Sequence, residues 1–172
     1  MNKKTRDLTL SALFAALTVV SLYIASIWPT GQLGLVAVAS LFVAATVIEI
    51  GIGSGLSVFV LCSIVGMLIL PNRTAPLFFI AFFGFYPIIK SLIERLRGTA
   101  LQWVLKLAVF NASLTVMWFL MRSLIIGAIA NIDGMLLIFI AGNVAFIVYD
   151  YGFTKLIWFY INRISKFNRV RS

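Results

Sequence analysis

The chain contains no histidine and only one cysteine, Cys62. Without histidine a serine–histidine relay cannot form, and a single cysteine permits neither an intramolecular disulfide nor a cysteine metal cluster. The glycine-rich signatures of nucleotide-binding loops are also missing. Asp150 has no evident second intramembrane aspartate for a paired-carboxylate site. Because an enzyme needs a nucleophile, a base or a metal set, we expect neither catalysis nor a bound metal or cofactor.

Charged residues are also scarce. They make up 11% of the 172 residues, whereas 62% are hydrophobic, and the mean hydropathy is +1.09. Soluble domains average about 25% charged and roughly 45–50% apolar residues. The composition therefore excludes a soluble globular domain, a disordered chain and a disulfide scaffold, and it predicts an integral membrane protein.

Long charge-free runs predict where the chain crosses the membrane. No charge occurs from Leu8 to Ile48, and the Pro-Thr-Gly-Gln segment at residues 29–32 divides that run into two spans. Since a spanning helix needs about 20 apolar residues, the whole chain, residues 1–172, predicts a single all-α membrane domain of six helices. Their approximate bounds are residues 8–28, 33–50, 54–70, 75–93, 101–126 and 134–161. Pro87 is expected to kink the fourth helix.

The basic residues gather on one side of the predicted bundle. An even number of spans puts both termini on the same side of the membrane, and the positive-inside rule makes that side cytoplasmic. Twelve of the 14 lysines and arginines then lie inside, and only Arg73 and Arg122 fall near the outer face. The net charge of +9 therefore reflects topology and attraction to lipid head groups, and we expect no nucleic-acid partner.

Polar residues within the last two spans predict a pocket. Asn111, Thr115, Trp118 and Arg122 are spaced four, three and four residues apart, so they share one helix face. Asn143 lies at a matching depth in the sixth span. Polar groups at membrane depth usually face other helices or a cavity. If the two helices are antiparallel neighbours, they bring two amides and one cation toward an outward-facing pocket.

The same residues also have a structural interpretation. Asn111 and Asn143 would then hydrogen-bond across helices and stabilise their packing, and Arg122 would reach the outer head groups. Asp133 is predicted to cap the sixth span, and Asn131 either caps or faces a ligand. With two outer arginines and no outer acid besides Asp133, the sequence leans toward an anionic or neutral ligand.

The fourth span has an aromatic outer half and a charged inner half. Its stripe has a spacing of four residues and contains Phe78, Phe82, Tyr86, Lys90 and Glu94. The outer aromatic residues would pack in the core, face lipid or stack on a flat ligand ring. For the inner half we predict a structural ion network, with an inner coupling or proton site as the alternative. The predicted members of the network are Glu49, Lys90, Glu94 and Asp150.

The first span carries a stripe of small residues, which let another helix approach closely. The stripe comprises Ser11, Ala12, Ala15 and Ala16. Residues 6–16 read RDLTLSALFAA, a basic start that leads directly into an alanine-rich helix. In this feature, in its size, in its six spans and in its cytoplasmic termini, the whole chain resembles the substrate-binding S component of energy-coupling-factor (ECF) importers, which take up vitamins in bacteria.

The resemblance implies both partners and a ligand site. It implies a subunit of the bacterial plasma membrane that captures a vitamin-like small molecule and docks through Ala12 and Ala16 on a membrane T subunit. That T subunit works with two ATPase subunits, which hydrolyse the ATP. By position, the family's ligand site maps onto the loop at residues 28–33, which includes Trp28, and onto Arg73, Arg122, Asn131 and Asn143. The alternatives are an MreD-like structural subunit of the cell-shape machinery, without a ligand, and an unrelated small permease.

Overall fold

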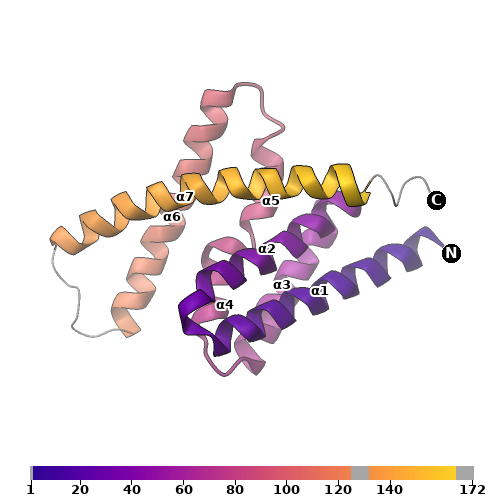
Figure 1. Ribbon diagram of the computed structural model, residues 1–172, viewed down its shortest axis with the longest axis horizontal. Coiled ribbons are helices and arrows are strands. Elements are labelled where there is room, and N and C mark those ends of the chain that lie inside the picture. The colour runs from indigo at the N-terminus through magenta and orange to yellow at the C-terminus, as the bar shows by residue number, and fades with distance from the viewer. Residues whose placement is uncertain (1, 125–131, 166–172) are drawn as a thin grey trace.

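All elements that the structure describes are helices (Figure 1). The computed structural model describes residues 2–124 and 132–165, with side chains at all of these except residues 29, 120–124, 132–138 and 164–165. The elements are α1 (Lys3–Ile27), η1 (Pro29–Gly31), α2 (Gln32–Glu49), α3 (Ile52–Ile69), α4 (Thr74–Phe78), η2 (Phe79–Phe83), α5 (Tyr86–Ile93), α6 (Thr99–Leu124), α7 (Ile132–Tyr160) and η3 (Ile161–Ser165).

The described part of the chain contains six helices that are long and apolar enough to cross a membrane. In this count α4, η2 and α5 together form one candidate span, Thr74–Ile93. The six correspond in order to the six spans predicted from the charge-free runs. The main difference is at the start, where α1 extends back to Lys3 and includes the basic residues of the N-terminus. The protein is therefore an all-helical membrane protein with six candidate transmembrane helices.

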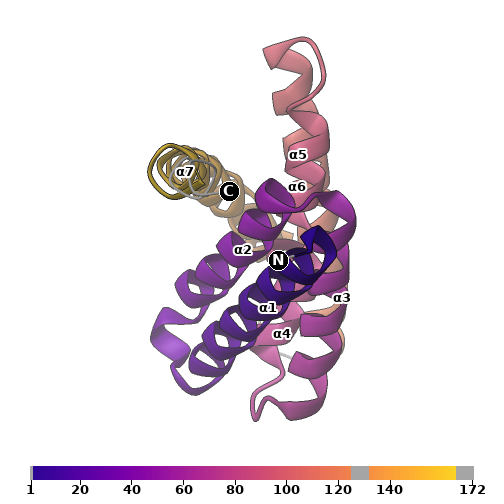
Figure 2. The same ribbon diagram turned by 90° about the vertical axis from the view of Figure 1, so that its right-hand side faces the viewer.

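The helices form a bundle in which α2 contacts most of the others. It packs against α1, α3, the α4–η2–α5 span and α7. Figure 1 shows α1 beginning and α7 ending on the same side of the molecule, as an even number of spans requires. The last two long helices differ from the expected antiparallel pair. α7 crosses α6 steeply in Figure 1, and Figure 2 shows α7 nearly end-on beside the upright α5 and α6.

The main core lies between α1, α2, α3 and the α4–η2 segment. Its buried members include Leu22, Val36, Val43 and Phe79. Buried hydroxyl groups in this region donate to carbonyls of their own helix, as Thr18 does to Phe14 at 2.8 Å. This arrangement satisfies polar groups where no water is available.

The fourth span is interrupted immediately before Pro87, where a kink was predicted. Proline has no N–H for the carbonyl four residues earlier, that of Phe83, and its ring crowds that position. The preceding turn, η2, is π-helical, and the N–H of Gly84 donates to the carbonyl of Phe79 at 2.7 Å. The interruption gives the aromatic half and the charged half of this span separate helical segments.

Gly84 allows α3 to approach this interruption, and replacing it tests the packing. A Cβ at Gly84 would lie 2.6 Å and 2.8 Å from two ring atoms of Phe59, and 2.8 Å from a ring atom of Phe79. We expect Gly84→Ala to lower the free energy of unfolding by about 1–3 kcal/mol through overpacking, measured by thermal unfolding in detergent. Gly53→Ala is the control, because a Cβ there meets nothing within 4 Å. Equal stability of the two variants would contradict the close packing.

Candidate functional site

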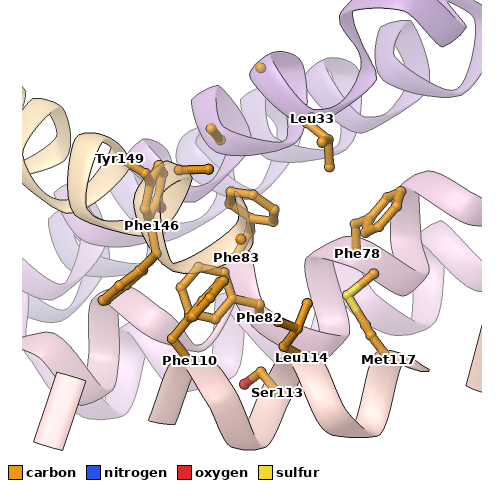
Figure 3. Close-up of a pocket in the computed structure, with 14 residues that line it drawn as sticks. Leu33, Phe78, Phe82, Phe83, Phe110, Ser113, Leu114, Met117, Phe146 and Tyr149 are labelled. Carbon is orange, nitrogen blue, oxygen red and sulfur yellow. The ribbon is translucent and has the colours of Figure 1, made fainter. Parts of the chain in front are cut away.

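A cavity of about 390 Å³ lies between α2, the α4–η2 region, α6 and α7 (Figure 3). This volume falls in the range of roughly 300–1,000 Å³ that is usual for small-molecule sites. Six of the lining side chains are aromatic: Phe78, Phe82, Phe83, Phe110, Phe146 and Tyr149. The other lining residues are Leu33, Gly34, Ala37, Ser113, Leu114, Met117, Gly142 and Ala145. The wall is thus almost wholly apolar.

Contacts between aromatic rings hold the wall in shape. Phe110 of α6 stacks on Phe146 of α7, with ring centroids 4.6 Å apart and an interplanar angle of 12°. Phe82 presents its ring at a steep angle to both, with centroids 5.3 Å and 5.8 Å away. Figure 3 shows Phe82 and Phe83 in the middle of the lining side chains. Because aromatic side chains have few rotatable bonds, this wall is largely pre-formed.

Beside the cavity, α5, α6 and α7 are joined by charged side chains, of which Lys90, Lys106 and Asp150 are buried. Lys90 contacts Asp150 at 2.5 Å and Glu94 at 2.8 Å. Lys106 contacts the same two carboxylates, Asp150 at 3.1 Å and Glu94 at 2.8 Å. The hydroxyl of Tyr86 donates to Asp150 at 2.6 Å. We call these five residues the ion network; its two cations and two anions cancel.

Three of the four residues predicted for the inner network meet in it: Lys90, Glu94 and Asp150. The fourth, Glu49, lies elsewhere and accepts a hydrogen bond from Tyr160 at 3.2 Å. Lys106 was not among the predicted members. Helical spacing is the sequence pattern that could have predicted its place in the network. Lys106 lies four residues before Phe110, on the face of α6 that lines the cavity.

Glu94 lies just beyond the candidate span Thr74–Ile93 and is partly exposed. Partial burial raises the pKa of its carboxyl, but hydrogen bonds from Lys106 and Lys90 and the charges of both lysines outweigh that effect. The pKa of Glu94 therefore lies below its ordinary value. Because the folded state holds this carboxylate ionised, its contribution to stability is lost as the pH falls through that lowered pKa.

The two asparagines of the predicted pocket bind each other. The side-chain amide of Asn111 donates to the side-chain oxygen of Asn143 at 2.9 Å, and that of Asn143 donates back at 3.0 Å. Each also donates to a carbonyl of its own helix, Leu107 and Phe139 respectively. The pair lies where α6 and α7 cross, and neither residue is among those lining the cavity. This geometry agrees with the structural interpretation, in which the two asparagines hydrogen-bond across helices and stabilise their packing.

Three other predicted substrate-binding residues, Trp28, Arg73 and Trp118, are also not among the residues that line the cavity. Trp28 is 63% exposed at the end of α1, Arg73 is exposed before α4, and Trp118 is half-buried on α6. The side chain of Arg122 and all of Asn131 lie outside the described residues, as does the side chain of Asp133. Ligand binding by these residues stays a prediction. In the sequence, the pattern that indicates the observed cavity is the four-residue spacing of aromatic side chains in the fourth span.

The small-residue stripe of α1 is divided between two environments. Ala12 and Ala16 are exposed and Ser11 is half-buried. Ala15 is buried, and its carbonyl accepts a weak hydrogen bond from the thiol of Cys62 at 3.5 Å. The pair predicted to contact a partner therefore lies on the surface.

Comparison of the chain with protein-family models, with curated proteins and with solved structures gives no match.

Removing one member of the ion network should destabilise the protein. Asp150→Asn leaves Lys90 and Lys106 with the single carboxylate of Glu94, so we expect a loss of about 3 kcal/mol of unfolding free energy, as for a broken buried ion pair. Adding Lys90→Met restores charge balance and should recover part of that loss. Thermal unfolding in detergent measures both effects. Glu49→Gln, outside the network, is the control, and an equal loss there would argue against the network's role.

The asparagine pair should show strong coupling. Asn111→Leu or Asn143→Leu alone leaves one amide without its cross-helix partner, and we expect each to cost about 0.6–1.7 kcal/mol. The double variant should cost less than the sum of the two single variants, because it removes both polar groups together. A double-mutant cycle of unfolding free energies measures the coupling, and simple additivity would count against the pair.

Proposed function

We propose that this protein is the substrate-binding subunit of an ECF-type importer of a small molecule. In this role the cavity holds the substrate, α1 docks on a membrane T subunit, and two partner ATPase subunits supply the energy. The sequence resemblance of the first helix suggests the family, and the cavity is the observation that carries the proposal.

The cavity distinguishes a binding subunit from a purely structural one. Small-molecule sites are concave and mostly apolar, with volumes of roughly 300–1,000 Å³. An open cavity of about 390 Å³ with a pre-formed aromatic wall fits this description, whereas a subunit that only scaffolds others has no need of one. This supports ligand binding over the MreD-like alternative.

The position of the cavity suits capture from outside the cell. Among the lining residues, Leu33, Gly34 and Ala145 are exposed, so the cavity opens to the surface beside them. Leu33 and Gly34 lie in the first turn of α2, the end of that helix that the charge distribution predicts to be extracellular. A substrate arriving from outside would therefore meet the mouth of the cavity first.

The exposed alanines of α1 suit docking. Small side chains allow the backbone of a second helix to approach closely in a membrane. Ala12 and Ala16 offer such a surface, while the opposite side of α1 packs against α2 and α3.

A bulky residue on this surface should separate docking from ligand binding. The wild-type protein, purified natively from its own membranes, should carry a bound small molecule together with one membrane subunit and ATPase subunits, identified by mass spectrometry. We expect Ala16→Trp to remove the partner subunits but retain the small molecule, because the substitution blocks helix approach without reaching the cavity. Ala112→Trp, at an exposed alanine of α6, is the matched control and should retain both.

Two results would overturn the proposal. One is co-purification with cell-wall elongation proteins and no small molecule, which would favour a structural subunit. The other is retention of ATPase subunits by Ala16→Trp and Ala12→Trp at wild-type levels, which would remove the docking role of α1.

A further inference from the structure

The cavity opens sideways between α2 and α7, and the opening indicates where a ligand comes from. Resting on the proposed function, we infer that this opening is a lateral portal to the bilayer and that the substrate is an amphiphile whose hydrocarbon chain enters through it. The way α2 and α7 are joined, the small residues between them and the surface around the opening support this inference.

Hydrogen bonds join α2 to α7 from the middle of α2 to its end. The hydroxyls of Ser40 and Tyr149 lie 3.0 Å apart, and Tyr160 donates to Glu49 at 3.2 Å. The two pairs follow the same order along both helices, so α2 and α7 run in the same direction. Figure 1 shows them converging toward their C-terminal ends. The two helices are thus held together at that end, and an opening between them lies toward their starts.

Small residues border the opening, one and two helical turns before the first of these hydrogen bonds. They are Ala37 and Gly34 on α2, and Ala145 and Gly142 on α7, and all four line the cavity. Gly34 and Ala145 are exposed, and a Cβ at Gly34 would meet nothing within 4 Å. We call the gap bordered by these four residues the portal.

The portal lies at hydrocarbon depth and has an apolar surround. The 18 residues of α2 span ~27 Å, close to the ~30 Å thickness of the hydrocarbon core. The portal falls in the first third of α2, which the charge distribution predicts to lie in the outer leaflet. The exposed residues next to it include Val38 on α2 and Val144 and Val148 on α7. Lipid chains are therefore the medium that meets this face of the protein.

The energetics of transfer favour a chain over a head group. Moving a hydrocarbon chain from lipid into the apolar cavity exchanges one apolar surrounding for another. A polar head group taking the same route would lose its hydration, at a cost of several kcal/mol unless it found hydrogen-bond partners. An amphiphile would thus insert its chain through the portal and keep its head group at the membrane surface, near the start of α2.

Photolabelling in phosphatidylcholine vesicles tests the route and the occupant. The probe is a phosphatidylglycerol with a diazirine in the middle of one acyl chain, and mass spectrometry identifies the labelled residues. We expect it to label Phe82 and Ser113, which are buried and line the cavity. A phosphatidylglycerol with the diazirine on its head group should label neither. Val116 and Phe119, exposed on α6, serve as internal standards that the chain probe should label in every variant.

Variants locate the entry route in the portal. Gly34→Phe and Ala145→Phe each place a ring in the portal, so labelling of Phe82 and Ser113 by the chain probe should be lost. Val144→Phe, at an exposed position that does not line the cavity, is the matched control and should be labelled as wild type. Thermal unfolding checks that each variant is folded.

Three outcomes would overturn the inference. They are absence of chain-probe labelling at Phe82 and Ser113 in the wild type, equal labelling of these residues by the head-group probe, and labelling that survives both portal variants. The experiment needs no partner subunits. Failure of the ATPase subunits to co-purify would therefore refute the importer role and leave the portal standing. Co-purification without labelling would refute the portal and leave the importer role standing.

Discussion

Asp150 is the acceptor on which the arrangement of the last three helical segments depends. It receives Tyr86 and Lys90 from α5 and Lys106 from α6. In hydrocarbon a lone charge is costly, so these groups must meet, and their meeting fixes α5, α6 and α7 relative to one another. The same network reaches the cavity through Tyr86, whose ring packs against Phe82, Phe146 and Tyr149. The position of the cavity wall therefore follows from where the charges pair.

The cavity exists because α6 and α7 cross instead of running side by side. Steeply crossing helices touch over a short region, and here that region holds the stacked Phe110 and Phe146, the two asparagines, and Gly142 close to Leu114. Away from the crossing the helices diverge (Figure 1). The facing part of α2 offers small residues, Gly34 and Ala37, which do not fill the gap. The interruption before Pro87 supplies the aromatic residues that shape what remains.

How far the sequence predicts this structure depends on the strength of each constraint. The six spans could be predicted because a charge in hydrocarbon is penalised wherever it falls. Lys90, Glu94 and Asp150 could be grouped because charges at one depth must pair, but depth does not say which way a helix face points. For that reason Glu49 was included and Lys106 was missed. The cavity was harder still, since a phenylalanine in a membrane protein looks the same in sequence whether it faces lipid, core or ligand.

The separation of the ion network from the cavity also bears on what would supply the energy for the proposed uptake. A permease driven by an ion gradient needs its coupling-ion site close to its substrate. Among the described residues that line the cavity, Tyr149 is the only one with a titratable side chain, and its hydroxyl forms a hydrogen bond with that of Ser40 at 3.0 Å. The carboxylates of the ion network are occupied by lysines from two helices. The described part of the cavity lining therefore offers no site for a coupling ion, which is consistent with the proposed role, in which partner ATPase subunits supply the energy.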